Sequence, residues 1–274
     1  MSFVILAMTV LVGAARAAPL GAPAMSGGGS DPVVNLGDAR ARADAQVSVV
    51  AGLVEAGMHR EALVAISELR GRGEDPPGLV PLQARAMHAT GLSSEALALL
   101  DAHVKHRRRD AATHAARGLI LADLGRVPES VEALRRAAKL LPDDAGVRNN
   151  LGVALLAAAS PAEAEVAFRA ALARDPANLR ARNNLGFALA RQQRDDDALA
   201  SFRAAGDEGA ARYNLGLACE LRGDLPAALV QYHAALAARP DDSATRTALA
   251  RLLPPPAPLS PPPPAAPPAP EPTP

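Results

Sequence analysis

Apolar residues recur along this chain at helical spacing, in pairs of segments that are separated by short turns. In the segment around Gly186, Leu185 and Leu189 are four residues apart, which places both on one face of an α-helix. Gly186 has no side chain, and the following segment opens with a small residue, Ala198. Two helices can approach closely at such positions. The pattern therefore predicts helix–turn–helix units in which the two helices pack tightly on each other.

The unit repeats along the chain with a nearly constant period. Glycines at 118, 152 and 186 are 34 residues apart, and the next, at 216, follows after 30. Leucine precedes three of these four glycines. A larger apolar residue occupies one position in the second half of each copy: Leu134, Phe168, Phe202 and Tyr232. Three copies close with a proline: Pro142, Pro176 and Pro240.

This combination resembles the tetratricopeptide repeat (TPR), which has Leu-Gly near its start, small and aromatic residues in its second half and proline at its end. The resemblance implies an all-α fold, a right-handed α-solenoid of about six repeats plus a C-terminal capping helix. Counted in register, the repeats and the cap occupy 43–76, 77–110, 111–144, 145–178, 179–208, 209–242 and 243–253. The first two copies keep the small residue and the turn glycine but lose the Leu-Gly pair.

Local signals mark several helix ends. Ser160 before Pro161 predicts an N-cap followed by proline at the first helical position, and Asp224 predicts a second N-cap. The aspartate pairs at 143–144 and 241–242 follow a proline, so each pair can cap the next helix. Copy five is four residues short after Ala205, which is close to one helical turn and keeps the apolar face nearly in phase.

The two ends of the chain differ in kind from the repeats. Residues 1–24 resemble a secretory signal peptide, because the apolar run 3–12 precedes a small-x-small cleavage pattern at 15–17, with 22–24 as a second option, although no Lys or Arg precedes the run. This predicts a periplasmic or secreted protein with no stable membrane anchor after cleavage. The alternatives are an uncleaved, membrane-associated start or a cytoplasmic protein. Residues 25–42 have a flexible-linker composition and then enter the first helix.

Residues 254–274 are mostly proline and alanine. Such a segment cannot form a packed core and favours an extended polyproline II conformation. Its simplest role is that of a disordered spacer or solubilising tail.

Composition narrows the possible chemistry. The formal net charge is zero and there is no tryptophan, which argues against nucleic-acid binding. The single cysteine, Cys219, is expected to be a buried small hydrophobe in a setting without a nearby cation. The six histidines are scattered, and no ligand is spaced to complete a metal site with His103 and His106. We therefore expect neither an enzyme nor a cofactor.

A basic run at 105–109 closes the second helix of copy two. Positive charge at a helix C-terminus complements the helix dipole, which makes a solvated helix end the preferred interpretation. A docking patch for an acidic partner is the alternative.

The candidate functional site is a row of polar residues on the first helices of copies four to six. Because the resemblance to TPR proteins places these positions in the concave groove, Asn150, Asn184 and Asn214 are expected to stand in a row along it. Their amides could bind the main chain of an extended peptide, since an amide both donates and accepts hydrogen bonds. The alternative is that they only bond neighbouring helices. The full predicted set is Asn149, Asn150, Val153, Asn183, Asn184, Phe187, Arg191, Tyr213, Asn214, Leu217 and Glu220.

These features together predict a non-enzymatic protein-interaction scaffold that holds an extended segment of a partner protein. The analogy with exported TPR proteins suggests a role in envelope assembly or secretion. The alternative function is a regulatory or docking subunit of an enzyme complex, in which the repeats act as a structural spacer. The sequence leaves the oligomeric state open.

Overall fold

The structure is a computed structural model that describes residues 36–252. The expected signal peptide, the linker before residue 36 and the proline-rich tail lie outside these residues. Within them the chain forms thirteen α-helices and no strand, which confirms the all-α fold. The helices are α2 (Leu36–Glu55), α3 (His59–Gly71), α4 (Leu79–Ala89), α5 (Ser93–His106), α6 (Ala111–Asp123), α7 (Val127–Leu140), α8 (Ala145–Ala157), α9 (Pro161–Arg174), α10 (Leu179–Arg191), α11 (Asp195–Ala205), α12 (Glu208–Leu221), α13 (Leu225–Ala238) and α14 (Ser243–Leu252).

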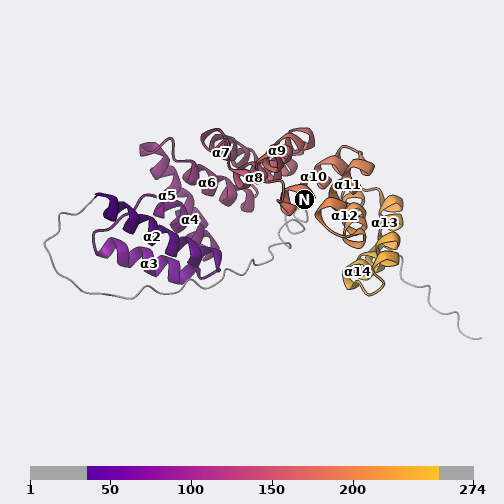
Figure 1. Ribbon diagram of the computed structural model, residues 1–274, viewed down its shortest axis with the longest axis horizontal. Coiled ribbons are helices and arrows are strands. Elements are labelled where there is room, and N and C mark those ends of the chain that lie inside the picture. Colours follow the sequence, from indigo (N-terminus) through magenta and orange to yellow (C-terminus); the bar gives the residue numbers. More distant parts are fainter. Residues whose placement is uncertain (1–35, 253–274) are drawn as a thin grey trace, which may run out of the picture.

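The helices form an elongated arch (Figure 1). Each odd-numbered helix from α3 to α13 packs on the even-numbered helix before it, and each pair contacts only neighbouring pairs. The even-numbered helices α8, α10 and α12 lie on the inner side of the arch, and α9, α11 and α13 lie on its outer side (Figure 1). This is the quasi-one-dimensional architecture of a repeat protein, in which stacking buries the apolar face of each unit.

A small residue in the first helix and a large one in the second pack together in each unit. In copies four to six these pairs are Gly152 with Phe168, Gly186 with Phe202, and Gly216 with Tyr232. A Cβ atom added at Gly152 would lie 2.5 Å from the Phe168 ring, closer than a real contact permits. The glycines are therefore required by the close approach of the two helices, as the sequence predicts.

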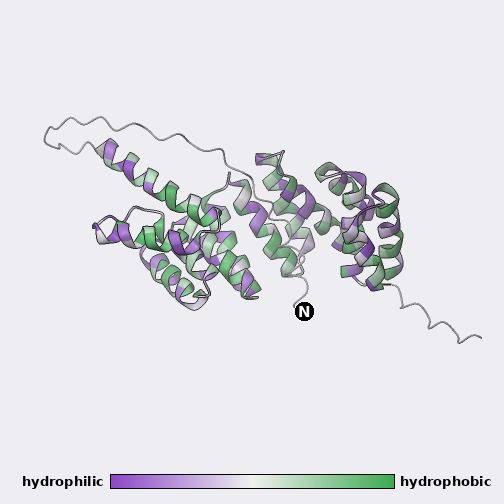
Figure 2. Ribbon diagram, turned by 90° about the horizontal axis from the view of Figure 1, so that it is seen from below, coloured by the Kyte–Doolittle hydropathy of each residue, from purple (hydrophilic) through white to green (hydrophobic). Residues whose placement is uncertain are grey.

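The apolar core is divided unequally along the arch. One cluster runs without interruption from Val131 in α7 to Leu249 in α14. A second cluster joins α4 to α7, and a third joins α2, α3 and α4. Hydrophobic and hydrophilic residues are mixed along most helices, whereas α13 is hydrophobic over most of its length (Figure 2). Helices α12 and α14 both pack on α13, yet only Ala228, Tyr232 and Ala235 of α13 are buried, so part of its apolar surface is exposed.

Side-chain caps begin most of the first helices, whereas among the second helices α3 to α13 only α13 has one. Asp144 and Asp242 cap first helices by accepting hydrogen bonds from the N–H groups of Val147 and Thr245, and both caps were predicted. The predicted cap at Asp224 is also confirmed, because its carboxylate accepts from the Ala227 N–H. The remaining side-chain caps on first helices are Asp110, Asn178 and Asp207.

Ser160 is the N-cap residue of α9 and Pro161 is its first helical residue, as predicted, but the expected side-chain cap is missing. The Ser160 side chain makes no capping hydrogen bond, and the ψ angle of this residue is 64°. The N-cap residues of α3, α5, α7 and α11 have ψ angles between 52° and 66°, and their side chains make no capping hydrogen bond either. These second helices follow a tight turn directly, and the turn rather than a polar side chain sets where they begin.

Those tight turns share one left-handed residue. Gly57, Gly91, Gly125 and Gly223 have φ between 73° and 92°, which glycine adopts without steric cost. At the equivalent position copies four and five have Ala159 (φ 55°) and Gln193 (φ 61°). A residue with a Cβ atom is strained in this region. Copies four and five therefore adopt the same turn at a higher conformational cost.

The shortening of copy five falls where the sequence places it. Helix α11 ends at Ala205, and α12 begins at Glu208 after only two residues. Arg203 from α11 and Arg212 from α12 both donate hydrogen bonds to the Glu208 carboxylate. These two arginines hold the pKa of Glu208 at about 2. The junction is thus closed by an ion-pair cluster.

Helix α14 ends the described array. It buries Ala248 and Leu249 against the preceding repeat, and it exposes Arg246, Thr247 and Arg251. This is the arrangement expected of a capping helix. Within residues 36–252, none of the helices combines the length and the apolarity that crossing a membrane requires.

Candidate functional site

All eleven residues of the predicted site lie on α8, α10 and α12, the helices on the inner side of the arch at copies four to six. Helix α10 packs against both of the other two helices. Ten of the eleven side chains are half-buried, and Arg191 is exposed. We call this surface, formed by the predicted set on α8, α10 and α12, the inner face.

The asparagines of the inner face bond one another across neighbouring helices. The Asn184 Nδ2 donates to Asn149 Oδ1 at 3.0 Å, and the Asn214 Nδ2 donates to Asn183 Oδ1 at 2.7 Å. The expected row of Asn150, Asn184 and Asn214 is therefore part of a staggered set of amides rather than three independent groups. These four asparagines therefore fit the alternative interpretation of the sequence, in which the amides bond neighbouring helices.

The pairing does not exhaust the amides. Each pair uses one N–H and one lone pair, whereas two amides together carry four N–H bonds and four lone pairs. Asn150 is half-buried, and within residues 36–252 no hydrogen bond is observed for its side chain. Most of the donor and acceptor capacity of the inner face is thus available to a ligand.

Two aromatic rings of the inner face pack against rings of the second helices. Phe187 meets Phe202 of α11 edge-on, with ring centroids 5.0 Å apart. Tyr213 lies 5.6 Å from Tyr232 of α13. Such contacts between aromatic rings hold their orientation. The inner face therefore presents half-exposed rings with little freedom to move.

The charge of Glu220 is largely neutralised within the chain. Its carboxylate accepts a hydrogen bond from the Tyr232 hydroxyl at 2.8 Å and pairs with Arg251 of α14 at 2.6 Å. Burial, together with the hydrogen bond to Glu220, raises the pKa of Tyr232, so the hydroxyl remains a donor at neutral pH. Glu220 is thus an anchor for α14 rather than a free negative charge. Arg191 has no ion pair among the described residues.

The structure adds a residue that the sequence reasoning missed. Leu119 of α6 is half-buried and occupies the position equivalent to Val153, Phe187 and Leu217. The four residues follow the glycines of copies three to six by one position each, so the repeat spacing itself could have identified the first of them. They form an apolar row along consecutive first helices.

Cys219 is buried, as expected, but its surroundings differ from the expectation. The Arg222 guanidinium lies 3.5 Å from the Cys219 sulfur, so a cation is present. Burial nevertheless raises the pKa of the Cys219 thiol, because desolvation outweighs the attraction to Arg222. The thiol stays protonated at neutral pH and is a poor nucleophile.

Two of the histidines, His88 and His103, take part in structural contacts. His103 lies 3.0 Å from Asp110, the capping residue of α6, and His88 bonds Ser93 and Asp123. Burial opposes ionisation of Asp110, but hydrogen bonds from Thr113 and His103 outweigh it and lower the pKa of this carboxyl group. In the part of the chain that the structure describes, no group of three or more metal-ligating side chains comes together.

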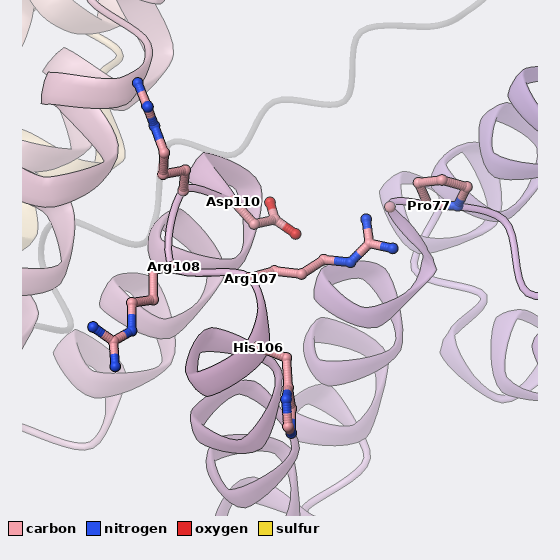
Figure 3. Close-up of a pocket in the computed structure, with 7 residues that line it drawn as sticks. Pro77, His106, Arg107, Arg108 and Asp110 are labelled. Atoms are coloured by element: carbon pink, nitrogen blue, oxygen red, sulfur yellow. The ribbon is translucent and has the colours of Figure 1, made fainter.

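The basic run at 105–109 borders a shallow hollow of about 590 Å³. The Arg107 side chain extends toward Pro77, whereas Arg108 points to the other side of the loop (Figure 3). The side chains thus diverge instead of converging on one point. This geometry suits a solvated helix end better than a site for a single anion.

The stack of helix–turn–helix units defines the molecule as an α-solenoid, a helical-repeat protein of the class that presents extended binding surfaces. Part of this stack matches models of the tetratricopeptide repeat. Residues 118–158 match the family model described as TPR repeat, and residues 149–209 match the one described as Tetratricopeptide repeat. The helices on either side of these residues continue the same architecture. No curated protein sequence matches the chain.

Solved structures share this fold. The TPR protein YrrB, described as having an unusual peptide-binding site, is 21% identical with a TM-score of 0.52, and the match covers 66% of this chain and 95% of YrrB. A chain of the APC/C hetero-tetramer Cut9-Hcn1 is 18% identical with a TM-score of 0.57, and the match covers 77% of this chain and 43% of that chain. At this level of identity the similarity establishes the fold alone.

Proposed function

We propose that this protein is a non-enzymatic interaction scaffold that binds an extended segment of a partner protein along the inner face. The observation that carries the proposal is the set of half-exposed amides and apolar side chains on α8, α10 and α12, the first helices of three consecutive copies. An extended peptide exposes its backbone N–H and C=O groups, which the free capacity of the amides matches without regard to side-chain sequence. The apolar row from Leu119 to Leu217 offers contacts for the peptide's side chains.

The architecture supports this function because it repeats one surface at regular intervals. A row of equivalent positions suits a ligand that is itself extended and regular. YrrB, with which this chain shares its fold, is described as binding peptides, so the fold is compatible with this use. The alternative, a docking subunit whose repeats are only a spacer, predicts no ligand on the inner face.

We further propose that the scaffold works outside the cytoplasm, in envelope assembly or secretion. The support is the apolar run at 3–12 followed by small residues. The amino-terminal sequence of the protein recovered from cells tests this directly. Cleavage after Ala17 or Ala24 would support export, and an intact start in a cytosolic protein would contradict it.

Binding is tested by selecting ligands from a library of random 12-residue peptides displayed on phage. The affinity of the selected peptides is then measured for three single variants, Asn150→Ala, Asn184→Ala and Asn214→Ala, and for the triple variant. Each lost hydrogen bond contributes roughly 0.5–1.5 kcal/mol, so each single change should weaken binding by about two- to tenfold. Asn150→Ala is the cleanest change, because its amide forms no observed pair.

The matched control is Val166→Ser on α9, where the side chain is 68% exposed on the other helix layer. It should leave both peptide affinity and melting temperature unchanged. Thermal melting of every variant separates binding from stability. A triple variant that melts early but binds the selected peptides normally when folded would support purely structural bonding and end the proposal.

A further inference from the structure

We infer that residues 254–274 of this chain bind along the inner face and compete there with the partner's peptide. The inference rests on the proposed function of that surface and names a second occupant for it. Four observations carry it: the place where the described part of the chain ends, the length of the segment, the hydrogen-bonding character of its backbone, and the character of the inner face.

The described part of the chain ends in contact with the inner face. Arg251, the residue before the last described one, donates to both carboxylate oxygens of Glu220 at 2.6 and 2.7 Å. Glu220 belongs to the inner face, on α12. The residues that precede the segment therefore contact the end of the surface that it would occupy.

The segment is long enough to cover the surface. Packed helices lie about 8–10 Å apart, so the path from α12 over α10 to α8 measures roughly 20 Å. At about 3.1 Å per residue in polyproline II, fewer than ten residues span this distance. The 21 residues from 254 to 274 can therefore turn back onto the inner face and still reach α8.

The backbone of the segment is an unusual hydrogen-bonding partner. Thirteen of its 21 residues are proline and carry no N–H, so it offers mainly carbonyl acceptors. The free N–H groups of the asparagines supply the donors that such a backbone needs. Polyproline II is already extended before binding, so little conformational entropy is lost.

Side chains add to the match. Proline-rich segments bind surfaces lined by aromatic rings, and the inner face presents Phe187 and Tyr213 half-exposed. Leu259 is the one large apolar residue between 254 and 274, and the apolar row that includes Leu217 can receive it. The only charge in the segment is Glu271, so neither surface repels the other.

Covalent attachment makes a weak contact sufficient. A tethered segment acts at an effective concentration on the order of 1 mM. A segment that bound with a Kd of about 0.1 mM as a free peptide would then occupy the inner face about nine-tenths of the time. Removing it should tighten the binding of a partner peptide about tenfold.

The experiment uses the asparagine side-chain amides as reporters. Ala265→Cys places a nitroxide spin label in the segment, and Cys219 is buried and does not compete for the label. We expect paramagnetic broadening of the NH₂ signals of Asn149, Asn150 and Asn184 in the full chain, unchanged on dilution. The control signal is Gln231 on α13, the helix that packs directly on α14. A segment that moves without binding would broaden Gln231 more than Asn149.

Two further variants complete the test. Leu259→Ser should reduce the broadening of the asparagine signals, and a chain that ends at Leu253 should bind the library-selected peptides more tightly. Broadening centred on Gln231, or unchanged peptide affinity after truncation, would overturn the inference while leaving the proposed function intact. Broadening that falls on dilution would show a contact between two copies and would also overturn it. If no library peptide binds either chain, the proposed function itself fails.

Discussion

The two ends of the array build the same unit with different cores. In copies one and two, Val50 packs with Ile66, and Ala84 packs with Leu100. In copies four to six the first-helix residue is glycine and its partner is an aromatic ring. Copy three pairs Gly118 with Leu134, so an aromatic ring fills the space beside the glycine only from copy four onward. Tight packing tolerates such an exchange because the total volume of the layer is kept.

The difference extends to the contacts between units. Gln192, which follows α10, donates to Glu165 of α9 at 2.7 Å, and Arg222 at the equivalent place after α12 pairs with Asp195 of α11 at 2.6 Å. Copy three has Leu124 at this position, and its side chain is 44% exposed. At this position the C-terminal units have a polar link in addition to a continuous core, whereas copies two and three are joined elsewhere, by Arg117 with Asp101 at 2.6 Å. Coupling between neighbours determines how cooperatively a repeat array unfolds.

The largest expected effect concerns the glycine–aromatic pair. Gly152→Ala places a Cβ atom 2.5 Å from the Phe168 ring and should destabilise the protein by about 1–3 kcal/mol, with Gly152→Leu costing more. Gly52→Ala in α2 has nothing within 4 Å and should instead stabilise by about 0.5–1 kcal/mol. Urea unfolding followed by circular dichroism measures both.

A double variant sharpens the comparison between the two ends. Gly152→Ala with Phe168→Leu recreates in copy four the small–large pair that copy two has at Ala84 and Leu100. It should recover part of the stability that Gly152→Ala loses. A double variant less stable than the sum of its single changes would show that the exchange of volume is not what distinguishes the units.

The second effect concerns the polar links. Glu165 is only 5% exposed and accepts from Gln192 and Arg194. Burial raises its pKa, but these hydrogen bonds outweigh burial and hold the pKa below its ordinary value. Glu165→Ala should cost about 1–2 kcal/mol, since hydrogen bonds to a charged group are lost.

The exposed pair of Glu129 with Arg126 in copy three is the matched comparison. Glu129→Ala should destabilise the protein clearly less than Glu165→Ala does, because solvent screens an exposed ion pair. Equal losses in the two variants, measured by urea unfolding, would contradict the idea that the C-terminal units are more strongly linked.

Most of this fold is readable from the sequence because the information is local and repeated. The Leu-Gly spacing, the small residue at Ala198 and its equivalents, and the aspartate caps each fix one feature within a few residues. The turn conformations are harder to predict. Ala159 and Gln193 adopt a left-handed conformation, which a sequence indicates only where the residue is glycine. Ser160 occupies the predicted N-cap position before α9 without making a side-chain cap, whereas Asp224 at the equivalent position before α13 makes one.

The candidate site is readable only in part. The sequence places the asparagines on equivalent helices, but which amide bonds which depends on how neighbouring helices are staggered. The observed partners are 35 and 31 residues apart, and no local pattern encodes that choice. Likewise, the anchoring of Glu220 by Arg251 depends on where α14 docks.

A smaller effect concerns the left-handed turn residues. Ala159→Gly and Gln193→Gly should each stabilise the protein by up to about 1 kcal/mol, because glycine relieves the strain of positive φ. The gain is reduced by the greater conformational freedom of glycine in the unfolded chain. Gly125→Ala at the equivalent position in copy three should destabilise. If Ala159→Gly lowers the melting temperature, the turns are not equivalent.

The smallest effect concerns the short junction between copies five and six. The stability that Glu208 contributes there should depend on pH. The two arginines beside Glu208 depress its pKa from 4.5 to about 2. A carboxyl group with a depressed pKa contributes stability that is fully present above pH 4.5 and lost as pH falls through 2. Glu208→Gln should therefore be less stable than the native chain at pH 6, and the difference should vanish below pH 2. Carboxyl NMR titration measures the pKa directly. Arg203→Gln should move that pKa back toward 4.5, because Arg203 makes the largest contribution to its depression. A pKa of Glu208 that is insensitive to Arg203→Gln would show that the junction is closed by packing alone.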